Sequence, residues 1–303
     1  MASRIASASL AGMADLPSPL ADVRILSLAL NLPGPAALMR CRRMGARCVK
    51  LEPPAGDPMR HYNPPAHAEL HEGVQVRVAD LKTEAGQAVL HEELARADVL
   101  LTSFRPSALD KLGLRWDALH ARYPSLSQVS IVGGAGAEAE VPGHDLTYLA
   151  EHGLVTGTDL PATLFADMAG SLMASEAIVG AALLRATHGA GQGRYVEVAL
   201  AEAAGYLALP RHWGLTRPTG AVGGAHAGYR VYACKDGRVA VAALEPHFAA
   251  RLCEAAGIAA SDMAAMLSPQ THTAISAFLA TRTRAELDRL ARERDLPLHT
   301  MGD

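Results

Sequence analysis

Short β-branched runs alternate with longer amphipathic segments through residues 23–199, and this alternation constrains the fold more than any other feature of the chain. Strands are predicted over 23–28, 48–51, 76–80, 99–103 and 129–132. Strands separated by helical patterns are typical of βαβ units, in which parallel strands are joined by helical crossovers. The sequence therefore predicts an α/β fold with a Rossmann-like parallel sheet and flanking helices.

Turn and cap residues indicate where the helices of this sheet begin and end. The segment 35–44 is predicted as the first helix, because Pro suits a first turn and Gly45 follows as a stop signal. Thr83 is a candidate N-cap for a helix that runs to about residue 95. The segment 166–186 is rich in Ala, Gly and Ser, which predicts a closely packed, buried helix that starts at Asp167.

A composition shift after Leu209 indicates a second, smaller α+β domain. Two alternating runs, 229–233 and 239–243, are joined by Lys235-Asp236-Gly237-Arg238, whose Asp-Gly pair is a hairpin turn signal, and helical periodicity follows to the end. We expect four regions: a disordered extension over 1–20, a large Rossmann-like domain over 21–209, a linker over 210–221 and a small α+β domain over 222–303.

Composition and missing motifs exclude several function classes. The formal net charge of −3 lacks the basic excess of nucleic-acid-binding proteins. The four cysteines show no zinc or disulfide spacing, which predicts no metal site and a reducing cytoplasm. The chain shows no uninterrupted run of about 18 apolar residues, so no membrane partner is expected. There is also no G-x-G-x-x-G, P-loop, G-x-S-x-G or H-E-x-x-H motif.

Three short motifs point to a particular chemistry. They are Gly143-His144-Asp145, Ala166-Asp167-Met168-Ala169-Gly170 and Ala243-Leu244-Glu245-Pro246. In this order they resemble family III CoA-transferases (the CaiB/BaiF family), and within that family the α-methylacyl-CoA racemase branch. Further segments extend the resemblance over most of 21–303: 34–35, 45–54, 79–82, 104–106 and 112–114.

The resemblance implies that His144 and Asp167 are the two bases at the α-carbon of a 2-methylacyl-CoA. Inversion by 1,1-proton transfer needs one group to remove the proton and another to return a proton on the opposite face. The resemblance places Glu245 near them as a supporting group from the small domain. Each residue also has an ordinary structural reading: a helix cap for Asp167, a surface histidine for His144 and a first-turn carboxylate for Glu245.

The same resemblance implies a CoA-binding large domain, with coenzyme A bound as part of the substrate and no permanently bound cofactor. Four cations would hold the phosphates by charge-assisted hydrogen bonds: Arg60, Lys82, Arg105 and Lys111. The full expected set is Arg60, Ala79, Asp80, Leu81, Lys82, Arg105, Lys111, Gly143, Asp145 and Tyr148. Glu72 stands where the family usually carries positive charge, so we expect weakened phosphate contacts.

The implied partner is an acyl-CoA thioester, and the implied assembly is an interlocked homodimer in which one chain's small domain closes the other's active site. The family commonly has a tail that returns from the small domain to the large one, and we expect this return segment to be missing, since the sequence reads Leu296-Pro297-Leu298-His299-Thr300-Met301-Gly302-Asp303 at this point. Three functions follow from the sequence. The first is a 2-methylacyl-CoA racemase or epimerase, the second a CoA-transferase with an aspartyl intermediate at Asp167, and the third a non-catalytic acyl-CoA-binding paralogue.

Overall fold

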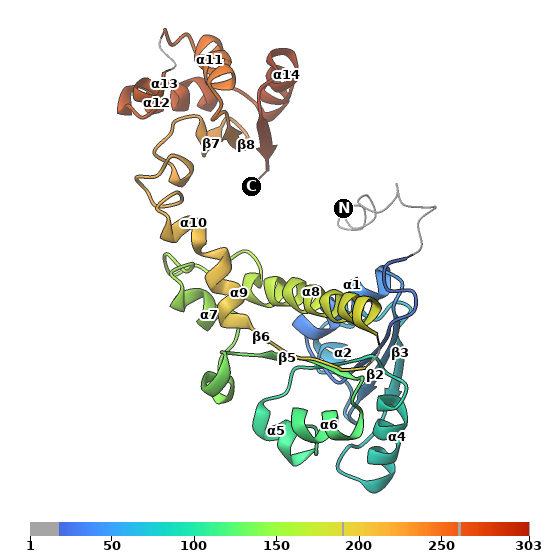
Figure 1. The fold of residues 1–303 in the computed structure, drawn as a ribbon. Coiled ribbons are helices and arrows are strands. Elements are labelled where there is room, and N and C mark those ends of the chain that lie inside the picture. The colour runs from blue at the N-terminus through green and yellow to red at the C-terminus, as the bar shows by residue number, and fades with distance from the viewer. Residues whose placement is uncertain (1–17, 190, 260–261, 303) are drawn as a thin grey trace. The chain divides into compact units, whose positions relative to one another are not determined.

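The computed structural model describes residues 18–189, 191–259 and 262–302. Residue contacts divide the chain into two compact units, with the boundary between Leu207 and Ala208. The first unit contains a six-stranded, all-parallel sheet in the order β3-β2-β1-β4-β5-β6 (Figure 1). Its strands are β1 (Arg24–Ser27), β2 (Arg47–Glu52), β3 (Gln75–Val78), β4 (Val99–Thr102), β5 (Ser127–Val132) and β6 (Tyr195–Ala199). The expected α/β fold is confirmed.

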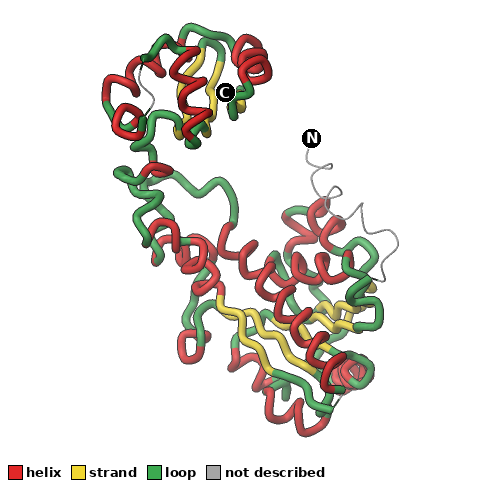
Figure 2. The backbone as a smooth tube through the Cα atoms, turned by 45° about the horizontal axis from the view of Figure 1, so that its top comes forward, coloured by secondary structure: helices red, strands yellow, loops and turns green. Residues whose placement is uncertain are grey.

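Helices cover both faces of this sheet (Figures 1 and 2). On one face α1 packs against α8, and α4, α5 and α6 lie on the other face. The helical segments of the first unit are α1 (Pro33–Arg43), α2 (Met59–Tyr62), α3 (Pro64–Leu70), α4 (Glu84–Leu94), α5 (Pro106–Lys111), α6 (Trp116–Arg122), the 3-10 helix η2 (Gly136–Glu140), α7 (Asp145–Glu151), α8 (Phe165–His188) and α9 (Leu200–Leu207).

The pleat of the central strands builds the two cores of the first unit. In β1, Ile25 packs into the core with α1 and α8, whereas Leu26 packs into the core on the other face. In β4, Leu101 packs into the core with α1 and α8, and Leu100 packs into the core on the other face. Successive side chains of a strand point to opposite faces, so a sheet covered on both sides buries side chains at successive positions, and most of them are apolar. This burial explains the short continuous apolar runs of the sequence.

Helix α8 differs from its sequence prediction in two respects. It begins at Phe165 after the N-cap Leu164, so Asp167 lies in the first turn and is not the cap. One side of the helix is buried, but Met168, Leu172 and Leu183 are exposed large apolar side chains. By length and composition α8 is also long and apolar enough to cross a bilayer, a test that the core helices of soluble proteins pass as well. The charged residues Asp167 and Glu176 interrupt the apolar residues of this segment, so the sequence shows no continuous apolar run here.

The second unit has a three-stranded antiparallel sheet in the order β7-β8-β9. Its elements are α10 (Leu209–His212), the 3-10 helix η3 (Ala221–Gly223), β7 (Tyr229–Cys234), β8 (Gly237–Ala242), α11 (Pro246–Ala255), α12 (Met263–Met266), α13 (Pro269–Ala280), α14 (Arg284–Arg294) and β9 (Leu298–Met301). The predicted hairpin is present, but its two-residue loop is Lys235-Asp236, because Cys234 pairs with Gly237. The expectation of a helical end is wrong, since β9 pairs with β8 there.

Most boundaries agree with the sequence prediction to within a few residues. All five predicted strands are observed, and Thr83 caps α4 by accepting a 3.1 Å hydrogen bond from the Gly86 amide. Strand β6 is missing from the prediction. Of the expected N-terminal extension over 1–20, residues 1–17 lie outside the residues that the structure describes. Leu20 is buried in the core of the first unit.

Candidate functional site

A cavity of about 800 Å³ lies where the parallel strands of the first unit end. Residues 30–33 follow β1, residues 103–105 follow β4 and Gly133 follows β5, and all of them line it. The strand order reverses between β1 and β4, which are neighbours although the chain runs from β1 to β2 and β3 first. In open α/β sheets ligands bind at this topological switch point, outside the carboxyl ends of the strands. The fold therefore marks this cavity as the candidate active site.

His144 and Asp167 both line this cavity, although 22 residues separate them in sequence. His144 is the N-cap of α7, and its amide donates a 3.0 Å hydrogen bond to the Thr147 hydroxyl, which donates in turn to the His144 carbonyl. The histidine ring is thus carried at the start of a helix on an exposed residue. The structure brings together the two residues that the motifs predict as the acid/base pair.

The surroundings of Asp167 favour its protonated form. Burial, followed by the negative charge of the neighbouring Asp145, raises the pKa of Asp167 to about 6, while His144 acts in the opposite direction. Asp145 is itself buried, and its Oδ1 accepts a 3.0 Å hydrogen bond from the Asp167 amide. A carboxyl group with a pKa near 6 exchanges protons readily at neutral pH, as a general acid or base must.

Four further predicted residues line the same cavity: Arg105, Gly143, Asp145 and Tyr148. Tyr148 is buried, and a Cβ on Gly143 would lie 2.5 Å from its ring, so this position requires glycine for close packing. Burial and then Asp167 raise the pKa of Tyr148, whereas Arg105 lowers it. Arg105 is exposed at the start of α5, which leaves its guanidinium free to meet a phosphate group.

The remaining predicted CoA contacts do not line this cavity. They are Arg60, Ala79, Asp80, Leu81, Lys82 and Lys111. Arg60 is committed to an ion pair, with its Nη2 3.1 Å from Glu52 Oε2. Residues 79–82 follow β3 at the edge of the sheet, where the Ala79 amide donates to the Glu52 carbonyl. Lys111 ends α5 and is exposed.

Glu245 belongs to the second unit and is the N-cap of α11, three residues after the last residue of β8. Its carbonyl accepts a 2.9 Å hydrogen bond from the Ala249 amide. Its side chain makes no capping hydrogen bond. The expected supporting role of Glu245 remains a prediction.

A buried charge cluster lies between β2 and the helices α2 and α3. Within the described ranges, Glu52, His67 and His71 form the one group whose ligand atoms could hold a metal ion, all within 4.8 Å of one another. Lys50 Nζ, however, lies 2.8 Å from His71 Nε2 and 3.3 Å from Glu52 Oε1. Its ammonium group already supplies positive charge to these ligand atoms, so the set does not fit a divalent ion as it stands.

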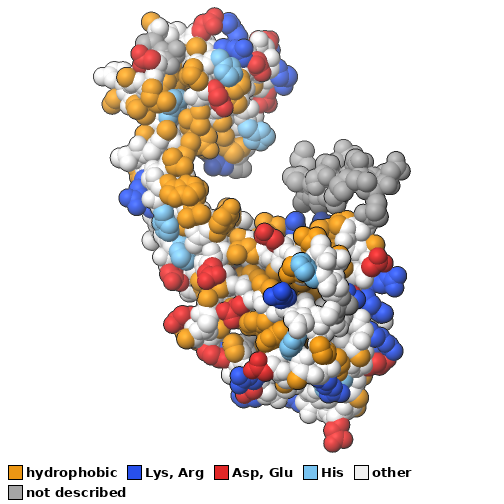
Figure 3. Space-filling view, in the orientation of Figure 1, with side chains coloured by type: hydrophobic (Ala, Val, Ile, Leu, Met, Phe, Trp, Pro, Cys, Tyr) orange, Lys and Arg blue, Asp and Glu red, His pale blue; other side chains and the backbone are white. Residues whose placement is uncertain are grey.

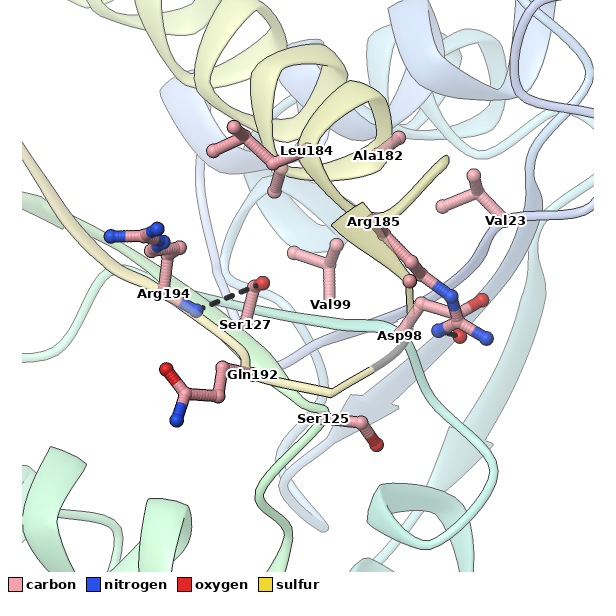
Figure 4. A pocket seen from close by; sticks show the side chains of 12 residues that line it. Val23, Asp98, Val99, Ser125, Ser127, Ala182, Leu184, Arg185, Gln192 and Arg194 are labelled. Carbon is pink, nitrogen blue, oxygen red and sulfur yellow. Dashed lines mark hydrogen bonds and ion pairs between the residues drawn. The ribbon is translucent and has the colours of Figure 1, made fainter. Parts of the chain in front are cut away.

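Other surface features carry less chemistry. A second cavity, of about 20 Å³, lies near Asp98 and Ser127, where Ser127 Oγ accepts a hydrogen bond from the Arg194 amide and Asp98 pairs with Arg185 (Figure 4). This volume suits a single water molecule, not a substrate. On the face of the first unit seen in Figure 3, Lys and Arg side chains are interspersed with Asp and Glu.

Sequence reasoning missed several residues of the cavity. Asn31, Met59 and Tyr62 line it, and burial followed by the charges of Asp57 and Asp167 raises the pKa of Tyr62. Asn31 has a positive φ of 64°, one of two such non-glycine residues among those described. The run Asn31-Leu32-Pro33-Gly34-Pro35 contains Asn, Pro and Gly, which are turn residues, and this is the local sequence signal for the bend.

Comparison with known proteins places these observations in a family. The family model "CoA-transferase family III" matches residues 20–303. The chain is 29% identical to human α-methylacyl-CoA racemase over 289 residues, which span 88% of this chain and 73% of the racemase. It is 36% identical to cinnamoyl-CoA:phenyllactate CoA-transferase of Clostridium sporogenes and 34% identical to succinyl-CoA–D-citramalate CoA-transferase of Chloroflexus aurantiacus. Those two alignments span 45% and 64% of this chain, and 36% and 51% of the transferases.

Solved structures support the same fold. A hypothetical protein of Mycobacterium tuberculosis superposes with a TM-score of 0.80 at 24% identity, over 95% of this chain and 86% of that one. A CaiB/BaiF family protein of Brucella suis gives a TM-score of 0.77 at 24% identity, over 95% of this chain and 85% of that one. Since the family model spans nearly the whole chain, the resemblance expected from the motifs is confirmed, and the chain belongs to CoA-transferase family III, whose named members above are enzymes.

Proposed function

We propose that this protein racemises or epimerises 2-methylacyl-CoA thioesters by two-base transfer of the α-proton. The observation that carries the proposal is the pair His144 and Asp167 on one cavity at the switch point of the sheet. The pKa of Asp167, raised to about 6 by burial and by Asp145, supports it further. A carboxyl group poised in this range can both donate and accept a proton at neutral pH.

The two proton transfers of the proposed reaction need no acid or base beyond these two residues. The neutral His144 ring takes the α-proton, and the electron pair of the broken C–H bond moves into the thioester to form an enolate. The protonated Asp167 then gives its proton to the opposite face of the α-carbon, which forms the new C–H bond and leaves an aspartate. In the reverse direction Asp167 is the base and His144 the acid. Preorganised backbone amides would stabilise the enolate oxygen.

Binding of the CoA portion rests on cations of the first unit. Arg105 lines the cavity and is the leading candidate for a phosphate contact. Arg60, Lys82 and Lys111 would act on more distant parts of the nucleotide. We further propose that Glu245 supports the site from a partner chain in a homodimer, and that the protein is cytoplasmic with no permanently bound cofactor.

A second candidate function is CoA transfer between carboxylic acids. The similarity to two named CoA-transferases favours it, as does a carboxylate at position 167 that opens into the cavity. In that reaction Asp167 attacks the thioester carbonyl, the CoA thiolate leaves, and an aspartyl anhydride forms. We rank racemisation first because His144 supplies a base that this route does not require. A non-catalytic acyl-CoA-binding role ranks third.

Proton exchange at the α-carbon separates these functions. The full chain is incubated with a 2-methylacyl-CoA in D2O, and loss of the α-proton signal is followed by NMR. We expect exchange of both enantiomers in the wild type. His144→Ala and Asp167→Asn should each lose inversion and lose exchange of the enantiomer whose base is missing. His188→Ala, at an exposed histidine at the far end of α8, should keep wild-type rates. Absence of exchange together with a hydroxylamine-trapped Asp167 adduct would replace racemisation with CoA transfer. Binding without either reaction would support the non-catalytic role.

A further inference from the structure

Three charged side chains of the first unit are completely buried next to the cavity. Lys50, Glu52 and Asp57 are each 0% exposed. Lys50 and Glu52 are two residues apart on β2, so their side chains leave the same face of the strand. Lys50 Nζ lies 2.5 Å from Asp57 Oδ2 and 3.3 Å from Glu52 Oε1. A buried ammonium group between two carboxylates is costly to assemble, and loss of one partner leaves an uncompensated charge.

The Asp57 carboxylate also binds two backbone amides of the cavity wall. The Asn31 amide lies 3.2 Å from both Oδ1 and Oδ2, and the Met59 amide lies 2.9 Å from Oδ1. Burial acts to raise the pKa of Asp57, but the hydrogen bonds from Lys50 and from these amides hold it below its ordinary value. The ionised group therefore accepts from one ammonium and two amides, which come from three separate segments of the chain.

Both amides belong to segments that line the cavity with Asp167. Residues 30–32 lie in the loop after β1, and Met59 with Tyr62 lies on α2. Asn31 takes a left-handed backbone conformation, which costs little for Asn and is disfavoured for most other residues. The loop then enters α1, which packs against α8, the helix that carries Asp167. The backbone at Asn31 thus sets the wall of the cavity relative to the reacting carboxyl group.

We propose that Asp57, fixed by Lys50, is a positioning residue that holds the loop at Asn31 and the start of α2 in place around the reacting carbon. This inference rests on the proposed function above. Arg105, the leading candidate for a phosphate contact, comes from the loop after β4, and Arg60 pairs with Glu52 and not with Asp57. CoA binding should therefore survive when the Asp57 carboxylate is removed. Displacement of a reacting group by about 1 Å can cost about 100-fold in rate. The expected signature is a lower kcat at an unchanged KM.

The main test compares Asp57→Asn with Asp98→Asn. Asp98 is a matched control because it is also ion-paired, to Arg185, and accepts a 2.8 Å hydrogen bond from the Arg24 amide at the opposite end of β1. We expect Asp57→Asn to lower kcat for α-proton exchange about 10-fold to 100-fold with KM changed less than about threefold. Asp98→Asn should keep both constants, although either variant can lower the melting temperature. Equal kcat in Asp57→Asn and the wild type would overturn the inference.

Glycine at position 31 supplies a second, independent test. Gly adopts positive φ freely, so the loop of an Asn31→Gly protein depends less on its anchor. Adding Asp57→Asn should therefore cost at least threefold less in kcat in the Asn31→Gly background than in the wild type, in a double-mutant cycle. Equal losses in the two backgrounds would show that Asp57 does not act through Asn31.

Amide hydrogen exchange reads the positioning without any substrate. In the wild type the Asn31 and Met59 amides should be protected, and in Asp57→Asn both should exchange at least tenfold faster while the Leu26 amide of β1 is unchanged. Retained protection would overturn the inference whatever reaction the protein catalyses. If the wild type shows no α-proton exchange but loses this protection on substitution, the proposed function fails while the anchoring by Asp57 is upheld.

Discussion

Replacement of Asp167 by asparagine should make the first unit more stable at neutral pH. The pKa of Asp167 is raised from 3.8 to about 6, first by burial and then by Asp145, so the folded chain binds this proton more tightly than the unfolded chain. The stabilisation is complete below pH 3.8 and is lost as the pH rises through about 6. About two pKa units at about 1.4 kcal/mol each correspond to about 3 kcal/mol at pH 7. Asparagine has no charge to bury and avoids this cost.

Urea unfolding at pH 4 and pH 8 measures this difference. The protein has two tryptophans, and Trp213→Phe leaves Trp116 as a reporter within the first unit. In that background the free energy of unfolding of Asp167→Asn should be higher than that of the Trp213→Phe parent, by about 3 kcal/mol at pH 8 and by less than about 1 kcal/mol at pH 4. Asp159→Asn, which removes the same formal charge from an exposed site, should show no such gap. A stability difference that is equal at both pH values, or larger in acid, would refute the explanation by burial.

Three further substitutions test the cavity and the fold. Arg105→Ala should weaken binding of a CoA thioester about 10-fold to 100-fold, measured by calorimetry, because it removes charge-assisted bonds to phosphate. Replacement of the exposed Arg115 by Ala should leave the affinity unchanged. Equal affinities of Arg105→Ala and the wild type would contradict the phosphate contact. Leu38→Ala should lower the free energy of unfolding by about 2 to 5 kcal/mol, since Leu38 is 0% exposed in α1, and a loss below about 1 kcal/mol would contradict the packing. Thr83→Ala should cost about 1 kcal/mol through loss of its bond to the Gly86 amide, and Thr83→Ser, which keeps the hydroxyl, should cost less.

The central strands could be predicted from sequence because a sheet covered on both faces leaves continuous apolar runs. β4 and β5 are buried at every position, and both were predicted. β6 was missed because it is an edge strand that carries Glu197 and continues directly into α9. β9 was missed because it has four residues, none of them fully buried, after Pro297.

The candidate site was predictable to the extent that short motifs carry it. His144 and Asp167 stand in such motifs, and the structure places both on one cavity. The Lys50–Asp57 network could not be predicted, because lysine on a strand normally indicates a solvent-exposed position. The left-handed residue Asn31 likewise has its amide bonded to Asp57, which is 26 residues away in sequence.

The pairing of β8 with β9 has a consequence for synthesis of the second unit. The two strands are separated by 55 residues, so β8 leaves the ribosome long before its neighbour exists. Until then one edge of the β7–β8 hairpin has open hydrogen-bonding groups, and unpaired edges favour association with other chains. Nascent chains stalled before Leu298 should therefore be targets for holdase chaperones, and those extended past Met301 should be released.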